Sequence, residues 1–340
     1  MGKMIYLDNA ATTKTAPEVV EAMLPYFTEM YGNPSSIYDF ASKSKEGVSK
    51  ARGQIADALG AKKEEIYFTA GGSESDNWAL KATFEAYKSK GNHIITTKIE
   101  HHAILHTCEY LEKERGAKIT YLDVDENGIV KLDELERVMK NAPGQKVIYV
   151  IPNFQNPTGS TMSFEKRKGI YELACKYNGV IIEDNPYGDL RFAGESVPSI
   201  KSLDKEGRVI YVGSFSKILA PGLRVGYACA PQEIFQKMVV CKQVSDVHTS
   251  IWPQLVCFKF MKECDLDEHF NKLRLIYKRK CGLMLENMDK YFSSKISYTR
   301  PDGGLFIWAT LPKGSDMMGF CTKAVKDYKI AVVPGTAFMI

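Results

Sequence analysis

The sequence predicts an α/β fold, in which a mostly parallel sheet has helices on both faces and a smaller α+β domain follows it. The length of 340 residues suits one large domain and one smaller domain. Up to about residue 230, short apolar, β-branched runs alternate with amphipathic helical patterns, which is typical of βαβ units. Beyond Pro231 this alternation changes to long helical patterns.

We expect the large domain over residues 1–255 and the small domain over residues 256–340, with segment 1–15 packing near the small domain. Helical patterns lie at 74–88, 103–115 and 163–177, between most of the strand-like runs. In the small domain, the run 304–311 follows the turn sequence PDGG and is predicted as a strand. The strands predicted for the large domain are 65–69, 93–97, 118–122, 146–151, 179–183, 208–212 and 225–228.

The composition, with 44% apolar and 25% charged residues, is that of an ordinary soluble globular protein. A net charge of +4 is slight for this length, so neither nucleic acid nor an anionic membrane is expected as a partner. The eight cysteines include no CxxC pair, which predicts reduced cysteines in a cytoplasmic protein. The first residues lack the apolar core of a signal peptide, and no run reaches the roughly 20 apolar residues of a membrane helix.

The segment 213–224 (GSFSKILAPGLR) carries the first candidate for chemistry, because it places Lys217 between two serines directly after the apolar run 208–212. A lysine at the end of a buried strand can lose its proton by desolvation and become a nucleophilic amine. Ser214, Ser216 and Arg224 suit an anionic group, and a phosphate fits them best.

Two further polar residues follow buried strands. Asp184 ends the apolar run 179–183, where a carboxylate costs free energy unless a cation pairs with it. Asn156 follows the run 146–151 in the sequence PNFQNPTG. The plain alternatives are an aspartate that caps the next turn and an asparagine in an ordinary loop.

Together, Lys217, Asp184 and Asn156 describe a site for pyridoxal phosphate (PLP). Lys217 holds the cofactor's aldehyde as a Schiff base and moves the substrate's Cα proton. Asp184 keeps the pyridine nitrogen protonated, so that the ring can take up electrons from the substrate. Asn156 hydrogen-bonds the ring hydroxyl with Tyr187 as a second donor. The phosphate is assigned to Ser214, Ser216 and Arg224.

A second phosphate-binding element is predicted at 68–77 (FTAGGSESDN). A strand, paired glycines and a helix in this order offer the N–H groups of a helix N-terminus to an anion, here at Gly72 and Ser73. An ordinary tight turn between a strand and a helix has the same pattern. His101, in the sequence EHHA at the next strand end, is expected to stack on the cofactor ring.

Two patterns resemble metal sites. His102 and His106 are four residues apart, as in a zinc pair, but no third ligand has metal spacing. Residues 123–128 with Glu134 fit the calcium loop of an EF-hand. Because a strand rather than a helix is expected before this loop, we predict a surface turn with Gly128 in the strained position, and no metal.

Residues 4 to about 135 resemble the cysteine desulfurases, PLP enzymes of the class V aminotransferase group. The matching pieces are YLDNAATT at 6–13, GNPSS at 32–36, 68–77 and EHHA at 100–103. From about 146 to 340 the chain instead resembles class I aminotransferases of the 2-aminoadipate/kynurenine type. The matching pieces there are NPTG at 156–159, EDNPYG at 183–188, 214–226 and PDGG at 301–304.

Both families share fold-type I, so a junction near 136–146 joins equivalent halves of the large domain, and the resemblance implies a homodimer. A desulfurase carries a histidine before its Schiff-base lysine, where this chain has Ser216, and a mobile cysteine loop that none of the later cysteines matches. In the class I family an arginine that binds the substrate carboxylate lies beyond a segment like 333–338, whereas no arginine follows Arg300 here. We therefore expect a chimeric chain that is either C-terminally truncated or anchors the substrate carboxylate through a different residue.

The resemblance and the residues together predict a PLP-dependent aminotransferase that interconverts an amino acid and a 2-oxo acid through a Lys217 Schiff base. Two alternatives are a cysteine desulfurase-like lyase and a hybrid that binds PLP without turnover. A third is a PLP-binding regulator of transcription, but the near-neutral charge and the desulfurase-like start argue against DNA binding.

Overall fold

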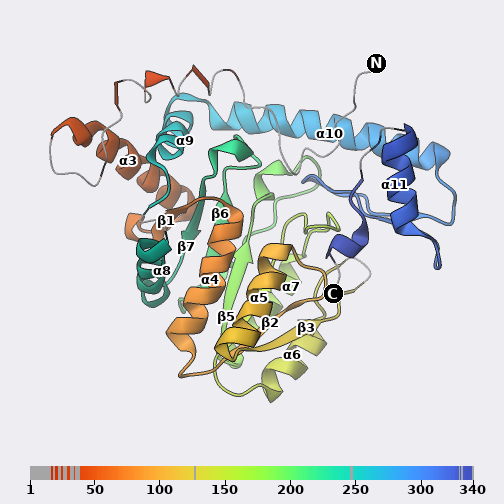
Figure 1. Cartoon of the computed structure of the whole chain (residues 1–340), viewed down its shortest axis with the longest axis horizontal. Coiled ribbons are helices and arrows are strands. Elements are labelled where there is room, and N and C mark those ends of the chain that lie inside the picture. The colour runs from red at the N-terminus through yellow and green to blue at the C-terminus, as the bar shows by residue number, and fades with distance from the viewer. Residues whose placement is uncertain are drawn as a thin grey trace.

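The computed structural model describes residues 39–338 except 126, 127, 246, 247, 329 and 331, together with a few isolated positions between 17 and 34. A seven-stranded sheet forms its centre (Figure 1). The strands are β1 (Ile66–Thr69), β2 (His93–Thr97), β3 (Lys118–Leu122), β4 (Lys146–Val150), β5 (Gly179–Asp184), β6 (Val209–Ser214) and β7 (Gly226–Cys229). Each lies within two residues of a predicted strand at both ends, so the predicted sheet is confirmed.

The strand order is β1-β7-β6-β5-β4-β2-β3. Strand β7 pairs antiparallel with β1 and with β6, whereas the four remaining pairings are parallel. The predicted mostly parallel sheet is therefore confirmed. Because β7 is the one reversed strand of this sheet, all the others place their carboxyl ends at one edge, which is where ligands bind in such sheets.

Helices cover both faces of the sheet, as predicted. Apolar side chains of α4, α5 and α8, such as Trp78 and Ile104, pack on one face against Val147 and Ile182. Helices α6 and α7 pack on the other face, where the alternating neighbours Ile148 and Ile181 point. The helices of the described residues are α3 (Ser42–Leu59), α4 (Gly72–Tyr87), α5 (His102–Arg115), α6 (Leu132–Asn141), α7 (Phe164–Lys176), α8 (Gln232–Ser245), α9 (Ile251–Glu263), α10 (Leu266–Tyr291) and α11 (Met317–Tyr328).

A third apolar cluster lies at the β1 side of the sheet, where α3 and α9 meet (Figure 1). It contains Ile55 of α3, Phe258 of α9, and the residues Phe215 and Leu219 that follow β6. The segment on either side of Lys217 is therefore anchored in the core. This packing holds the backbone of Lys217 in a fixed position.

The long helix α10 leads to the C-terminal elements, where β8 (Ser297–Tyr298) pairs antiparallel with β9 (Ala309–Thr310). The predicted strand 304–311 is wrong for residues 304–308. Gly304 has a φ of 73° and donates its N–H to Leu190 O over 3.1 Å, so the chain turns against Phe154 before β9 begins. The boundary between 255 and 256 falls inside α9 and stays a prediction, and segment 1–15 lies outside the described residues.

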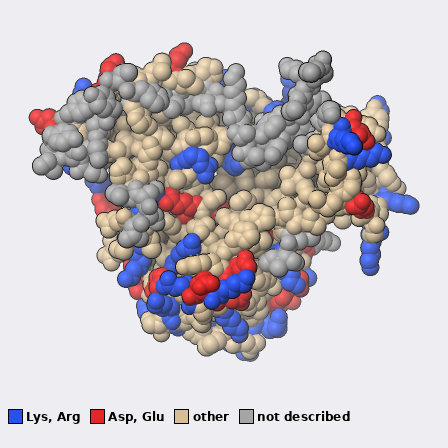
Figure 2. Space-filling view, in the orientation of Figure 1, with Lys and Arg blue, Asp and Glu red and all other residues tan. Residues whose placement is uncertain are grey.

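Lysine, arginine, aspartate and glutamate side chains are interspersed on the face shown in Figure 2, in keeping with the small net charge of +4. None of the helices in the described part of the chain combines the length and apolar character needed to cross a membrane.

Candidate active site

The predicted site residues come from the loops at one edge of the sheet. Asp184 is the last residue of β5, and Ser214 is the last residue of β6. Gly72 follows β1, His101 follows β2, and Asn156 follows β4. Because these strands run in the same direction, the fold gathers segments that are far apart in the sequence at a single edge.

Asp184 is a buried carboxylate with one oxygen paired and one orphaned. Its side chain accepts a hydrogen bond at Oδ2 from the Tyr149 hydroxyl over 2.8 Å. Its other oxygen, Oδ1, is buried and has no hydrogen-bond partner among the described residues. Burial raises the pKa of Asp184 to about 7, although the bond from Tyr149 acts in the opposite direction. A buried acceptor of this kind calls for a donor that the protein itself does not supply.

Asn156 and Tyr187 form a polar pair beside this carboxylate. Both side chains are buried. Burial raises the pKa of Tyr187, with the charge of Asp184 as the next cause, so its phenol stays protonated at neutral pH. The Tyr187 ring packs edge-on against Phe306, with ring centroids 5.3 Å apart. The Asn156 Oδ1 atom also lacks a partner among the described residues.

Lys217 lies in a single tight turn after β6. The turn is closed by a hydrogen bond from Leu219 N to Phe215 O of 2.9 Å, and the lysine is half-buried. Desolvation lowers the pKa of His101 most, and the charges of His102 and then Lys217 lower it further. Nδ1 of His101 accepts the Ala103 N–H at 3.1 Å, which caps α5 and fixes the ring.

Two serine hydroxyls and an arginine lie at the end of β6. Ser214 and Ser216 are buried, and their Oγ atoms are 2.9 Å apart. Ser214 Oγ also accepts the N–H of Ser216 over 3.1 Å. Arg224 adopts a left-handed conformation with a φ of 53°, which is uncommon outside glycine.

The two predicted phosphate elements converge on each other. A Cβ atom at Gly71, which has a φ of 134°, would lie only 2.9 Å from Nη2 of Arg224, so the guanidinium rests against the turn that begins α4. Thr69, Gly226 and Ser214 are register neighbours across β1, β7 and β6. Gly72 and Ser73 are the first residues of α4, where the N–H groups have no partner within the helix.

Three residues that surround Asp184 belong to no motif that the sequence shows. Tyr149 reads as an ordinary core aromatic. Asp76 and Glu100 are buried carboxyls. Burial raises the pKa of Asp76, and the charges of Asp184 and Glu100 raise it further. The signal for Asp76 is its position: Leu80 and Thr83, four and seven residues later, are fully buried, so Asp76 lies on the inward face of α4.

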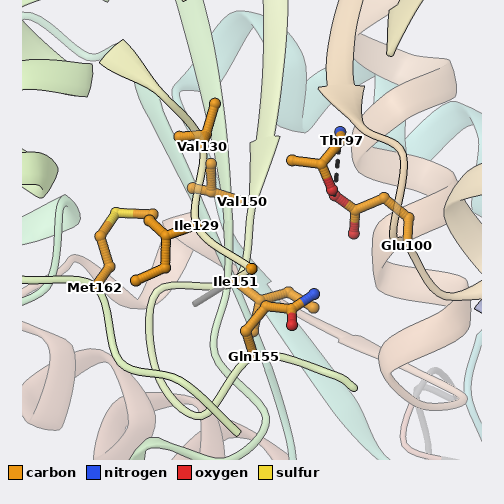
Figure 3. Close-up of a pocket in the computed structure, with 9 residues that line it drawn as sticks. Thr97, Glu100, Ile129, Val130, Val150, Ile151, Gln155 and Met162 are labelled. Atoms are coloured by element: carbon orange, nitrogen blue, oxygen red, sulfur yellow. Dashed lines mark hydrogen bonds between the residues drawn. The ribbon is translucent and has the colours of Figure 1, made fainter. Parts of the chain in front are cut away.

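Glu100 also lines a small cavity (Figure 3). Its Oε1 accepts hydrogen bonds from the hydroxyls of Thr96, over 3.1 Å, and Thr97, over 2.7 Å. Burial raises the pKa of Glu100 to about 7 despite these bonds. The cavity of about 20 Å³ is also lined by Gln155 and aliphatic side chains, and it has room for about one water molecule. It is therefore too small to hold a cofactor.

The two patterns that resemble metal sites also appear in the structure. The rings of His102 and His106 stack with centroids 5.1 Å apart on the exposed start of α5. Asp125 donates its N–H to Ile129 O in a turn where Gly128 has the predicted positive φ of 74°. Asp125 forms an ion pair with Lys166; residues 126 and 127 lie outside the described residues. No group of three metal-ligating side chains lies together in the described part of the chain.

A mostly parallel sheet with helices on both faces is the fold of the fold-type I PLP enzymes. Two family descriptions match the chain: "Aminotransferase class-V" over residues 5–183 and "Aspartate amino-transferase" over residues 100–323. The chain belongs to the aminotransferases, and it combines parts that match two of their families. Its cofactor is PLP, which both families use.

Individual relatives include an aminotransferase and a cysteine desulfurase. Aromatic-amino-acid aminotransferase 1 of Thermococcus litoralis is 38% identical over 282 residues, which cover 81% of this chain and 65% of that protein. Cysteine desulfurase IscS of Clostridium botulinum is 54% identical over 180 residues, or 53% of this chain and 43% of that protein. The chain thus spans less than two thirds of the length of either relative.

A solved structure extends the likeness over nearly the whole chain. The α-aminoadipate aminotransferase LysN of Thermus thermophilus, complexed with N-(5'-phosphopyridoxyl)-L-leucine, superimposes with a TM-score of 0.81 and 30% sequence identity. The match covers 96% of this chain and 82% of that one.

Proposed function

We propose that the chain is a PLP-dependent aminotransferase that interconverts an amino acid and a 2-oxo acid, with Lys217 as the residue that holds the cofactor. The observation that carries the proposal is the orphaned Oδ1 of buried Asp184. A protonated pyridine nitrogen supplies both the hydrogen bond and the positive charge that this oxygen lacks. Lys217 follows β6, which is the strand next to β5, so lysine and carboxylate come from adjacent strands.

The polar residues around Asp184 fit the other substituents of the ring. The phenol of Tyr187 and the amide of Asn156, both buried, are proposed as the hydrogen-bond partners of the ring hydroxyl. His101, whose ring is fixed by the N–H of Ala103, is proposed to stack on the ring. Pairing with a pyridinium lowers the pKa of Asp184 again, because an opposite charge favours the carboxylate.

The phosphate is assigned to the place where the two loops converge. Arg224 lies against Gly71, so its guanidinium and the first N–H groups of α4 can bind the same anion. These donors come from elements that pack independently in the core, which holds them in place before the anion arrives. The phosphate-binding residues proposed are Gly72, Ser73, Ser214, Ser216 and Arg224.

When bound, PLP supplies the electron sink that stabilises negative charge at the substrate Cα. Lys217 would hold the cofactor through Nζ, and the free amine of Lys217 would act as the base that accepts and returns the proton at the substrate Cα. Asp184 would keep the pyridine nitrogen of the bound cofactor protonated. The aliphatic and aromatic residues next to Lys217, such as Phe215, are buried and exclude water from its turn.

The same proposal includes a homodimer, small-molecule amino-acid and 2-oxo-acid substrates, and a cytoplasmic location. Sites of fold-type I enzymes usually lie at a dimer interface, which supports the homodimer by resemblance. Gel filtration with light scattering tests it: the proposal expects twice the chain mass of 38.2 kDa.

A second candidate is a cysteine desulfurase, because 180 residues are 54% identical to such an enzyme. The deciding experiment incubates the PLP-loaded protein with single amino acids, cysteine included. It measures pyridoxamine phosphate, 2-oxo acid and sulfide together. The proposal expects 2-oxo acid and pyridoxamine phosphate without sulfide. Sulfide or persulfide from cysteine alone would support the desulfurase, and a bound cofactor with no product would identify a hybrid without turnover.

A further inference from the structure

A fully buried lysine lies at the start of α4, close to the proposed phosphate site. Lys242 of α8 is 0% exposed, and its Nζ lies 2.7 Å from Oε1 of Glu74 in the first turn of α4. The ammonium also lies 5.0 Å from the centre of the Trp78 ring. Burying a lysine costs several kcal/mol unless a partner compensates, so this pair is expected to have a specific role.

Glu74 connects the lysine to the turn that precedes α4. Its second oxygen, Oε2, accepts a hydrogen bond from the backbone N–H of Ala70. The next residue, Gly71, is the one against which the Arg224 guanidinium rests. A continuous chain of contacts therefore runs from α8 through one carboxylate to the backbone of the turn.

The charge of Glu74 requires this partner. A carboxylate in the first turn interacts favourably with the N-terminal end of the helix. However, the phosphate of PLP would occupy the same end and carries more than one negative charge. Without Lys242, the partly buried carboxylate would lie unpaired beside a second anion. With Lys242, it can hold the turn without repelling the phosphate.

We infer that Lys242 is a positioning residue for the cofactor's phosphate: it neutralises Glu74 and so lets that carboxylate fix the Ala70–Gly71 turn. This inference rests on the proposed phosphate site at Gly72, Ser73 and Arg224. Lys242 itself does not touch the cofactor in this account. The ion pair spans 168 residues and joins the desulfurase-like half to the class I half.

The test compares two ligands, PLP and pyridoxal, which lacks the phosphate. Dissociation constants are measured from the visible absorption band of the lysine-bound ligand. K242M is expected to bind PLP about tenfold more weakly, which is the lower end of the loss seen when a residue that orients a metal ligand is replaced. Its affinity for pyridoxal is expected to stay unchanged. The double variant E74Q/K242M, which removes both charges, is expected to recover part of the PLP affinity.

K146M is the matched control, because Lys146 is also a buried lysine, hydrogen-bonded to Tyr177 O, but lies at the opposite edge of the sheet. It should lower stability without changing either affinity. If K242M does not fold, K242Q replaces it, since the amide keeps a donor to Glu74 without the charge.

Equal PLP affinity in wild type and K242M, or an equal loss for PLP and pyridoxal, would overturn the inference. A wild-type protein that forms no absorption band with either ligand would instead refute the proposed function, so the two failures are distinguishable.

Discussion

The Tyr149 hydroxyl donates a 2.8 Å hydrogen bond to Oδ2 of Asp184, across the paired strands β4 and β5. Tyr149 is 1% exposed, so this bond is shielded from water. It holds one carboxylate oxygen and leaves the other, Oδ1, without a partner among the described residues. Tyr149 thereby orients the carboxylate that the proposal places at the pyridine nitrogen.

Replacing Tyr149 with phenylalanine tests this relationship. We expect Y149F to lower the free energy of unfolding of the apo-protein by about 1–2 kcal/mol, because a buried acceptor loses its donor. The pKa of Asp184 should rise further, since the lost bond favoured the charged form. Urea unfolding and the pH dependence of PLP affinity measure both effects. Y177F removes a tyrosine hydrogen bond at the protein surface, to Glu136, and serves as the control with little change.

The variant D184N tests the role of the carboxylate itself. It should still bind PLP through Lys217, but we expect transamination to fall by about 10²–10³-fold, as when one preorganised electrostatic group is removed from an active site. Single-turnover formation of pyridoxamine phosphate measures this loss. D204N alters another buried aspartate, which is paired with Lys201 away from the site, and should retain the wild-type rate. Full activity in D184N would contradict the assignment.

The buried carboxyl of Glu100 makes stability depend on pH. Its folded-state pKa of about 7 lies above the ordinary value of 4.5, so the folded protein binds this proton more tightly. Its contribution to stability is complete below about pH 4.5 and is lost as the pH rises to 7 and beyond. In the wild-type apo-protein, Glu100 makes the free energy of unfolding fall as the pH rises from 5 to 8. In E100Q this fall should be smaller by about 3 kcal/mol. Denaturant titrations at both pH values test this, and E172Q, at an exposed position of α7, should keep the wild-type slope.

A glycine is required where Arg224 meets the start of α4. With a φ of 134° and the guanidinium 2.9 Å from a would-be Cβ, G71A should destabilise the protein by about 1–3 kcal/mol and weaken PLP binding. Thermal unfolding and PLP titration measure the two effects. G53A is the control, because Gly53 lies within α3 with no atoms within 4 Å of a would-be Cβ, so alanine should be neutral or stabilising there. Equal PLP affinity in both variants would show that the close approach at Gly71 does not matter.

Much of the fold was predictable because apolar runs and turn residues are local signals. The sheet followed from the alternation of strands and helices, and the gathering of Asp184, Asn156 and Lys217 followed from parallel strand direction. The strand at 304–308 was wrong, because contacts of Gly304 with Phe154 and Leu190, both distant in the sequence, decide the conformation there.

The remaining parts of the site depend on contacts that no short window contains. Glu74 and Lys242 lie 168 residues apart, and each alone reads as a helix surface charge. Asp76 and Glu100 read as helix and loop carboxyls until the fold brings them into the electrostatic range of Asp184. Such pairs become visible only when the packing of α4 against its neighbours is known.

Lys217 is the lysine that we expect to hold the cofactor. Borohydride reduction of the PLP-loaded protein, followed by proteolysis and mass mapping, measures this directly. If Lys217 holds the cofactor, we expect one phosphopyridoxyl-lysine, at Lys217, and none in K217A. Modification of a different lysine in the wild type, or an unchanged yield in K217A, would contradict it.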